Sequence, residues 1–165
     1  MEAPIKFELI GIILGLAIYN GVILNIQFPM VVYWKLMNQS LSLDDLIEFD
    51  ADLGNGLKAI LDCDSPTLKD DLVLNFVYEY QSCWGEDKKV LLKPDGENIF
   101  VDQSNKHEYV DLMVDYILNK SVEKYFKKFH FGFHLVCKGQ FLFTFEPEEL
   151  ELMICGNPIL DFKAL

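Results

Sequence analysis

The longest apolar run in the chain lies near its start, from Ile10 to Lys35. Apolar residues recur at helical spacing from Lys6 to Tyr19, and this pattern predicts a first helix. Asn20-Gly21 is a natural stop for that helix, because glycine adopts a left-handed backbone conformation without steric cost. Pro29 suits the first turn of a second helix, which we expect from Met30 to Met37.

A membrane span is the alternative interpretation of this apolar run. A spanning helix needs about 20 unbroken apolar residues. The break at Asn20-Gly21 comes too early, and the amides of Asn25 and Gln27 follow it. Two helices in a protein core are therefore the favoured interpretation. Gly11 and Gly15 form a face of small residues that would let another backbone approach closely.

Short amphipathic helices and strands are expected after Leu41. Ser42, followed three residues later by Asp45, resembles a capping box that opens a helix. The residues from Leu72 to Tyr80 are rich in aromatic and β-branched side chains, so they predict a strand. In that strand Leu72, Leu74, Phe76 and Tyr78 would share one face. The remaining predicted elements are helices over Asp44–Phe49, Asp50–Cys63, Asn105–Leu118 and Val122–Phe133, a helix from Pro147 to Gly156, strands over Lys89–Leu92 and Asn98–Asp102, and a turn at Pro94-Asp95-Gly96 with positive φ at the glycine. The predicted fold class is α+β, mainly helical.

The charge balance limits the kinds of partner. The chain has 165 residues, 51% of them hydrophobic, and its formal net charge is −12. An acidic chain repels phosphate backbones, so we expect no nucleic acid partner and favour basic protein surfaces. The N-terminus, MEAPIK, is a poor secretory signal. The four cysteines, Cys63, Cys83, Cys137 and Cys155, are therefore expected to be reduced thiols, as in the cytoplasm or the nucleus.

Three patterns could carry chemistry, and each has a simpler interpretation. His130, His134 and Cys137 share a helical face at zinc-ligand spacing, but no fourth ligand lies nearby and aromatic residues surround them, so we predict no metal and no cofactor. No cysteine is marked as an activated nucleophile. The acidic residues favour a solvated face, or a surface that attracts a basic partner, over a catalytic pair; they are Asp44, Asp45, Glu48, Asp50, Asp52, Asp62 and Asp64. The basic residues favour a solvated face; they are Lys120, Lys124, Lys127 and Lys128.

The apolar residues of the middle segment form the most informative set. One helix, one strand and a second helix each present apolar side chains that could converge. A small subdomain core is one interpretation, and a partly exposed groove is the other. The set is Leu53, Leu57, Ile60, Leu72, Leu74, Tyr109 and Met113.

Several segments of the chain resemble HECT-type ubiquitin ligases, with an order and spacing that agree along nearly all 165 residues. They are similar to the group related to the E6-associated protein and the HERC ligases. Tyr125 departs from this pattern, because relatives often carry glutamine there. The segments are GIILGLAIYN, FPMVVYWKLM, SLSLDDL, LLKPDGENIFVDQSNKHEYVDLMVDYILNKSVEKYFKKFHFGF and FEPEELELMICG.

The resemblance implies a two-lobed HECT domain, of which this chain would be a partial N-lobe. Residues 1–40 and 121–155 would form the large helical subdomain, and residues 41–120 an inserted small α+β subdomain. Residues 156–165 would be the hinge, at Gly156, Asn157 and Pro158, and the start of the C-lobe. The catalytic cysteine of the family belongs to that C-lobe, so we expect no catalytic residue in this chain and no activity from it alone.

The resemblance also implies the partners. The small subdomain would bind a ubiquitin-conjugating enzyme through the seven apolar residues above, so that ubiquitin passes to the C-lobe cysteine and then to a substrate lysine. Ubiquitin and protein substrates would be further partners, the substrates through regions outside this chain. Two alternatives stay open, namely a non-catalytic decoy that occupies conjugating enzymes and a small membrane-anchored protein.

Overall fold

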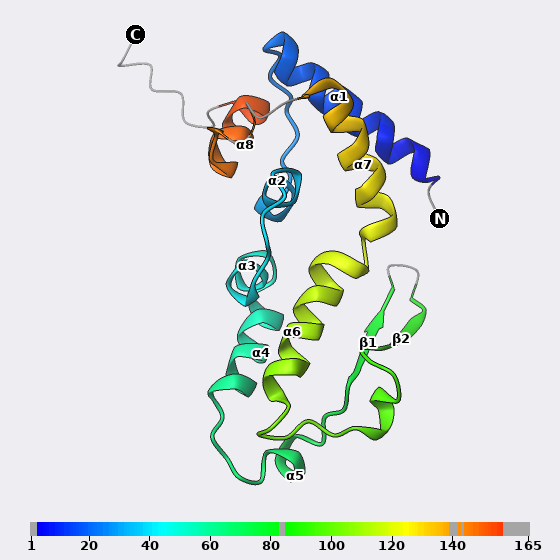
Figure 1. The fold of residues 1–165 in the computed structure, drawn as a ribbon, viewed down its shortest axis with the longest axis vertical. Helices are drawn as coiled ribbons and strands as arrows, with labels where there is room; N and C mark the ends of the chain where they lie inside the picture. Colours follow the sequence, from blue (N-terminus) through cyan, green and yellow to red (C-terminus); the bar gives the residue numbers. More distant parts are fainter. Residues whose placement is uncertain (1–2, 83–84, 139–141, 143, 157–165) are drawn as a thin grey trace. The chain divides into compact units, whose positions relative to one another are not determined.

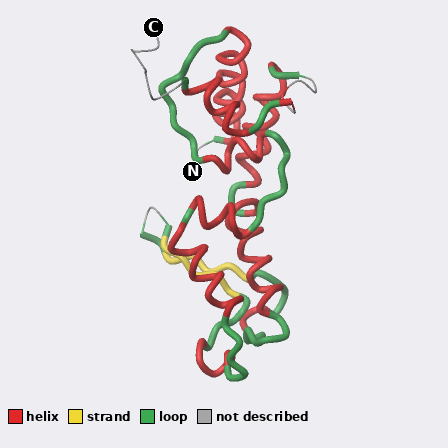
Figure 2. Tube along the Cα trace, turned by 90° about the vertical axis from the view of Figure 1, so that its left-hand side faces the viewer, coloured by secondary structure: helices red, strands yellow, loops and turns green. Residues whose placement is uncertain are grey.

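The computed structural model describes residues 3–82, 85–138, 142 and 144–156. The chain divides into two compact units. Residues 1–40 and 122–165 form one unit, which we call the terminal unit, and residues 41–121 form the inserted unit. Figure 2, with helices in red and strands in yellow, shows helices in both units and the described strands in the inserted unit. This composition confirms the mainly helical α+β class.

The terminal unit is a packed group of helices. It contains α1 (Pro4–Asn20), α2 (Met30–Leu36), α7 (Glu123–Val136) and α8 (Pro147–Cys155). Helices α1 and α7 lie side by side along much of their length (Figure 1). The fully buried centre is supplied by Leu14, Tyr33, Leu36, Phe133, Leu150 and Ile154.

Glycines allow α1 and α7 to approach closely. A Cβ atom on Gly11 would overlap the carbonyl oxygen of Phe129, and one on Gly132 would overlap the carbonyl oxygen of Glu8. The expected role of Gly11 as a close-approach residue is therefore confirmed. Gly21 ends α1 with φ 63° and ψ 33°, as the Asn20-Gly21 pattern predicted.

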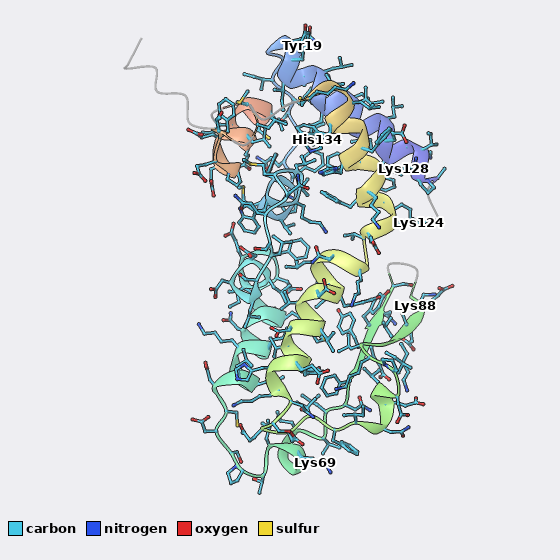
Figure 3. The ribbon with its side chains drawn as sticks, viewed as in Figure 1. Tyr19, Lys69, Lys88, Lys124, Lys128 and His134 are labelled. Atoms are coloured by element: carbon cyan, nitrogen blue, oxygen red, sulfur yellow. The ribbon has the colours of Figure 1, made fainter. Side chains whose placement is uncertain are left out.

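Two histidines connect α7 to the end of α2. The Nε2 atom of His134 lies 3.1 Å from the carbonyl oxygen of Leu36, and Figure 3 shows His134 on the α2 side of α7. The Nε2 atom of His130 lies 3.1 Å from Oδ1 of Asn38. The two imidazole centroids are 4.1 Å apart. Burial, and then the neighbouring His134, hold the pKa of His130 below its usual value.

The inserted unit combines helices with one hairpin. It contains α3 (Leu43–Phe49), α4 (Ala51–Asp62), α5 (Leu68–Leu72), β1 (Val77–Gln81), β2 (Asp87–Leu91), the 3-10 turn η1 (Gly96–Asn98), α6 (Lys106–Asp115) and a π-helical turn η2 (Tyr116–Lys120). The strands are antiparallel, in a register that runs from Val77 opposite Leu91 to Gln81 opposite Asp87. The capping box of Ser42 and Asp45 is present, as predicted.

Two strand predictions are wrong in part. The segment predicted as one strand from Leu72 begins instead as the end of α5, since Leu68 and Leu72 also have helical spacing and Leu68 is buried. Strand β1 starts only at Val77. The predicted third strand is reduced to one bridge between Asn75 and Phe100.

One turn and one helix start also differ from the prediction. In the Pro94-Asp95-Gly96 turn the positive φ, 59°, belongs to Asp95. Gly96 is required there for a different reason, because a Cβ atom would overlap the carbonyl oxygen of Phe76. The helix predicted from Asn105 begins at Lys106 as α6, and the side chain of Asn105 accepts a hydrogen bond from the amide of Asp102 instead of capping α6.

Within the described residues, no helix has the length and apolar character needed to cross a membrane. Helix α1, the most apolar of them, has 17 residues and packs against α7.

We expect Gly132→Ala to destabilise the protein by about 3 kcal/mol, because its methyl group would force α1 away from α7. The measurement is the free energy of unfolding in urea. Gly56→Ala is the matched control, since no atom lies within 4 Å of the added methyl group. Alanine also favours the helix, so this control should gain stability. Equal effects of the two substitutions would contradict the close packing of α1 on α7.

We expect the protein to lose stability as the pH falls from 7.5 to 5.5. The pKa of His130 is lowered in the folded state, so below the ordinary histidine pKa of about 6.5 the unfolded chain binds more protons. His130→Gln should therefore reduce the loss of unfolding free energy over this range. His107→Gln, at an exposed position on α6, is the control substitution. An unchanged pH dependence in His130→Gln would refute the assignment.

Candidate functional site

The seven residues of the predicted groove all lie in the inserted unit, at three levels of exposure. Leu57, Tyr109 and Met113 are buried, with 3%, 5% and 3% of their surface exposed. Helix α4, which carries Leu57, packs against α6, which carries Tyr109 and Met113, and we call these two helices the α4–α6 layer. Leu53, Ile60 and Leu74 are half-buried, and Leu72 is 42% exposed. Any partner that reaches this set therefore meets Leu53, Ile60, Leu72 and Leu74, because the other three residues are buried.

A fully buried phenylalanine holds the middle of the inserted unit together. The ring of Phe76 meets the edge of the Tyr109 ring at 90°, with 5.5 Å between centroids. The ammonium of Lys93 lies 3.7 Å from the centre of the Phe76 ring and also pairs with Glu108 at 2.8 Å. Because the Tyr109 hydroxyl belongs to this interior, burial raises its pKa. Tyr109 thus connects α6 to the start of the hairpin.

An exposed apolar pair at the end of α5 was not predicted as such. Val73 follows Leu72, is 66% exposed and has φ 48°. A β-branched residue rarely adopts this left-handed conformation, so the backbone here is strained. The alternation of the expected strand had placed Val73 on the face opposite Leu72. The exposed pair adds Val73 to the candidate surface, and the sequence carried no direct signal for it.

The carboxyl end of α4 is bound by side chains from the start of α6. The ammonium of Lys106 donates hydrogen bonds to the carbonyl oxygens of Leu61 (2.7 Å) and Cys63 (2.8 Å). The side-chain amide of Gln103 donates to the carbonyl oxygens of Cys63 and Ser65, both at 2.8 Å. Sequence reasoning missed both residues, because a lysine and a glutamine before an amphipathic helix have the composition of an exposed turn.

The turn that carries these two side chains is itself well ordered by hydrogen bonds. The Oδ1 atom of Asp102 accepts from the hydroxyl of Ser104 at 2.6 Å, from the amide of Ser104 at 2.8 Å and from the amide of Asn105 at 3.2 Å. These hydrogen bonds, chiefly that of the Ser104 hydroxyl, lower the pKa of the Asp102 carboxyl. Because all three hydrogen bonds favour the ionised carboxylate, the turn is charged at neutral pH.

The other candidate chemistries have structural explanations. No group of three potential ligands that could hold a metal ion occurs within the described part of the chain. Cys137 is buried, which raises its pKa, and it contacts the carbonyl oxygen of Gly15. The Cys155 thiol donates to the carbonyl oxygen of Ile26 at 2.8 Å. Cys83, the thiol expected to be most exposed, lies outside the described residues.

The charged groups act mainly in local ion pairs and caps. Asp50 accepts from the amide of Leu53 and so caps α4. Of the predicted basic patch, Lys120 pairs with Asp115, Lys127 with Glu123, and Lys128 with Glu8. Of the predicted hinge, Gly156 is described, with φ 74° next to Ile23, while Asn157 and Pro158 lie outside the described residues.

Comparison with known proteins places this geometry in a family. The family described as HECT-domain (ubiquitin-transferase) matches residues 2–165. The chain is 42% identical over 159 residues to the probable E3 ubiquitin-protein ligase HERC4 of Homo sapiens, which covers 96% of this chain and 15% of HERC4. It is 38% identical over 174 residues to the probable E3 ubiquitin-protein ligase HECTD2 of Mus musculus, and the aligned region covers 97% of this chain and 22% of HECTD2. For the probable E3 ubiquitin-protein ligase HERC6 of Homo sapiens the identity is 37% over 158 residues, and the aligned region covers 96% of this chain and 15% of HERC6.

The chain therefore spans less than a quarter of the length of these relatives. The family match nevertheless runs through both units of the structure, including the α4–α6 layer and the turn before α6. The chain belongs to the HECT-domain family of ubiquitin transferases.

Proposed function

We propose that the inserted unit binds a ubiquitin-conjugating enzyme, so that ubiquitin can pass from that enzyme to a ligase cysteine and then to a lysine of a substrate. The observation that supports this proposal is the exposed apolar pair Leu72 and Val73, next in sequence to the half-buried Leu74 of the predicted groove. Exposed apolar patches on otherwise polar surfaces mark protein interaction sites.

The packing of α4 on α6 gives the half-buried part of the predicted groove a rigid support. Helix α4 packs against α6, and Leu57, Tyr109 and Met113 on these helices are buried, so the half-buried Leu53 and Ile60 are carried by a packed helix pair. A preformed surface loses little conformational entropy on binding, which favours useful affinity from a small contact area. Transient signalling contacts of this kind are typically small.

Charge supports the same partner class. Helix α3 and the first turn of α4 carry Asp44, Asp45, Glu48, Asp50 and Asp52, within a chain of net charge −12. An acidic flank attracts a basic protein surface over long range and raises the rate of encounter. We therefore propose a conjugating enzyme with a basic contact face.

The chemistry of transfer is assigned to a cysteine outside these 165 residues. Ubiquitin would arrive as a thioester, and a ligase thiolate would attack its carbonyl carbon and release the thiol of the conjugating enzyme. The four cysteines here lie in the contexts DCD, SCW, VCK and ICG, and none matches the Thr-Cys-Phe/Tyr context that the resemblance to HECT ligases implies for the acceptor. We propose that residues 41–120 dock, that residues 1–40 and 121–155 support them, and that Gly156, Asn157 and Pro158 form the hinge. The compartment would be the cytoplasm or the nucleus.

We expect Leu72→Asp to weaken binding of a conjugating enzyme at least tenfold, because it places a charge in the exposed apolar pair. A panel of purified ubiquitin-conjugating enzymes would be screened against the full chain by NMR, and the dissociation constant of the best binder measured.

Leu91→Asp is the matched control. Leu91 is also an exposed leucine of the inserted unit, at 48%, but it lies on β2. It should bind within twofold of the unchanged chain, and circular dichroism should show both variants folded. Equal losses in the two variants, or no binding by any enzyme of the panel, would rule out this surface.

A further inference from the structure

Lys106 is the one charged side chain buried among the described residues, with 5% of its surface exposed. Burying an ammonium group is costly unless hydrogen bonds and opposite charge compensate for it. Its position makes the burial more demanding, because Lys106 is the first residue of α6 and the amino end of a helix disfavours a cation.

The carboxyl end of α4 supplies the compensation. The last carbonyl groups of a helix lack partners within the helix, and that end carries partial negative charge. The Lys106 ammonium lies there, bonded to the carbonyl oxygens of Leu61 and Cys63, with Oδ1 of Asp64 at 3.7 Å. The Asp64 side chain is 98% exposed, so water weakens that ion pair. The two carbonyl groups are therefore the main partners.

The residues from Phe100 to Lys106, which we call the junction turn, also contact the segments on either side of the exposed pair. The amide of Val101 donates to the carbonyl oxygen of Leu74 at 2.8 Å, and Phe100 forms the bridge to Asn75. The ammonium of Lys69, which Figure 3 shows on α5, lies 5.1 Å from the centre of the Phe100 ring.

We infer that Lys106 is a positioning residue for docking of the conjugating enzyme, acting through the loop between α4 and α5. One short turn binds the end of α4, which carries Ile60, and the chain on both sides of Leu72 and Val73. Lys106 and Gln103 donate the hydrogen bonds from this turn to the end of α4 and the loop that follows it, and Lys106 is the charged donor of the two. Without them the apolar residues of α4 and α5 lose their fixed separation. This role rests on the proposed function.

The test compares Lys106→Met with Val110→Ala in the full chain. Methionine keeps most of the aliphatic stem of Lys106 and removes its donors and charge. Val110 is 2% exposed on the same helix and lies outside the docking set, so its truncation lowers stability while every hydrogen-bond donor of the junction turn is kept. Gln103→Leu, which removes only the neutral donors to the loop, is the second variant if Lys106→Met does not fold. Urea unfolding curves, recorded at several temperatures, identify a temperature at which every variant is fully folded in the absence of urea.

Two readouts are measured at that temperature. One is the dissociation constant for the conjugating enzyme that the unchanged chain binds best. The other is the rate at which iodoacetamide alkylates Cys63, followed by peptide mass spectrometry, because Cys63 lies in the loop and its thiol is half-buried. Lys106→Met should weaken binding at least fivefold and raise the alkylation rate of Cys63 at least threefold. Val110→Ala should change each by less than twofold.

Unchanged binding by folded Lys106→Met, or by folded Gln103→Leu in its place, would overturn the positioning role. So would an equal loss of binding in Val110→Ala, because the effect would then follow stability alone. If the unchanged chain binds no conjugating enzyme, the proposed function fails and the docking role fails with it. In that case the alkylation rate of Cys63 still shows whether Lys106 holds the loop.

Discussion

The burial of Phe76 is the constraint on which the inserted unit depends. Its amide donates to the carbonyl oxygen of Gly96 at 2.9 Å, and its carbonyl oxygen accepts from the amide of Leu92 at 2.9 Å. Its ring contacts Tyr109 on α6 and the ammonium of Lys93. One residue therefore connects the hairpin, the turn at Gly96 and α6. A unit of this size has little apolar interior, so such a shared contact replaces the broad core of a larger domain.

This arrangement explains why only part of the predicted apolar set is available to a partner. Tyr109 is occupied by Phe76 and Leu57 lies on the helix that packs against α6, so both stabilise the unit. Leu72 is outside that interior. The core interpretation therefore holds for Leu57 and Tyr109, and the groove stays a prediction for the residues that keep exposed surface. Periodicity identifies the residues on an apolar face. It cannot distinguish core residues from residues that face a partner, because both roles require apolar side chains at the same spacing.

Local sequence signals predicted the helices well. Gly21, the Ser42–Asp45 box and Pro147 mark three helix ends that the structure confirms. The predictions were wrong where two periods fit the same residues, as at Leu68 to Leu72, which suits a helical turn as well as a strand. They were also incomplete where a residue acts on a distant segment. Gln103 and Lys106 bind carbonyl groups about 40 residues earlier in the chain, and no local pattern reveals such a contact.

The two cations of the inserted unit that are largely withdrawn from water show how an acidic chain uses its few basic residues. Lys93 stacks on Phe76 and Lys106 binds the end of α4, whereas Lys88 and Lys89 form exposed ion pairs on the hairpin. Exposed pairs contribute little to stability, but removing one partner of a buried charge leaves the other groups unsatisfied. The positive charges with structural roles thus lie inside, and the exposed segment before α4 stays acidic. The same distribution that orders the unit leaves its outer face suited to a basic partner.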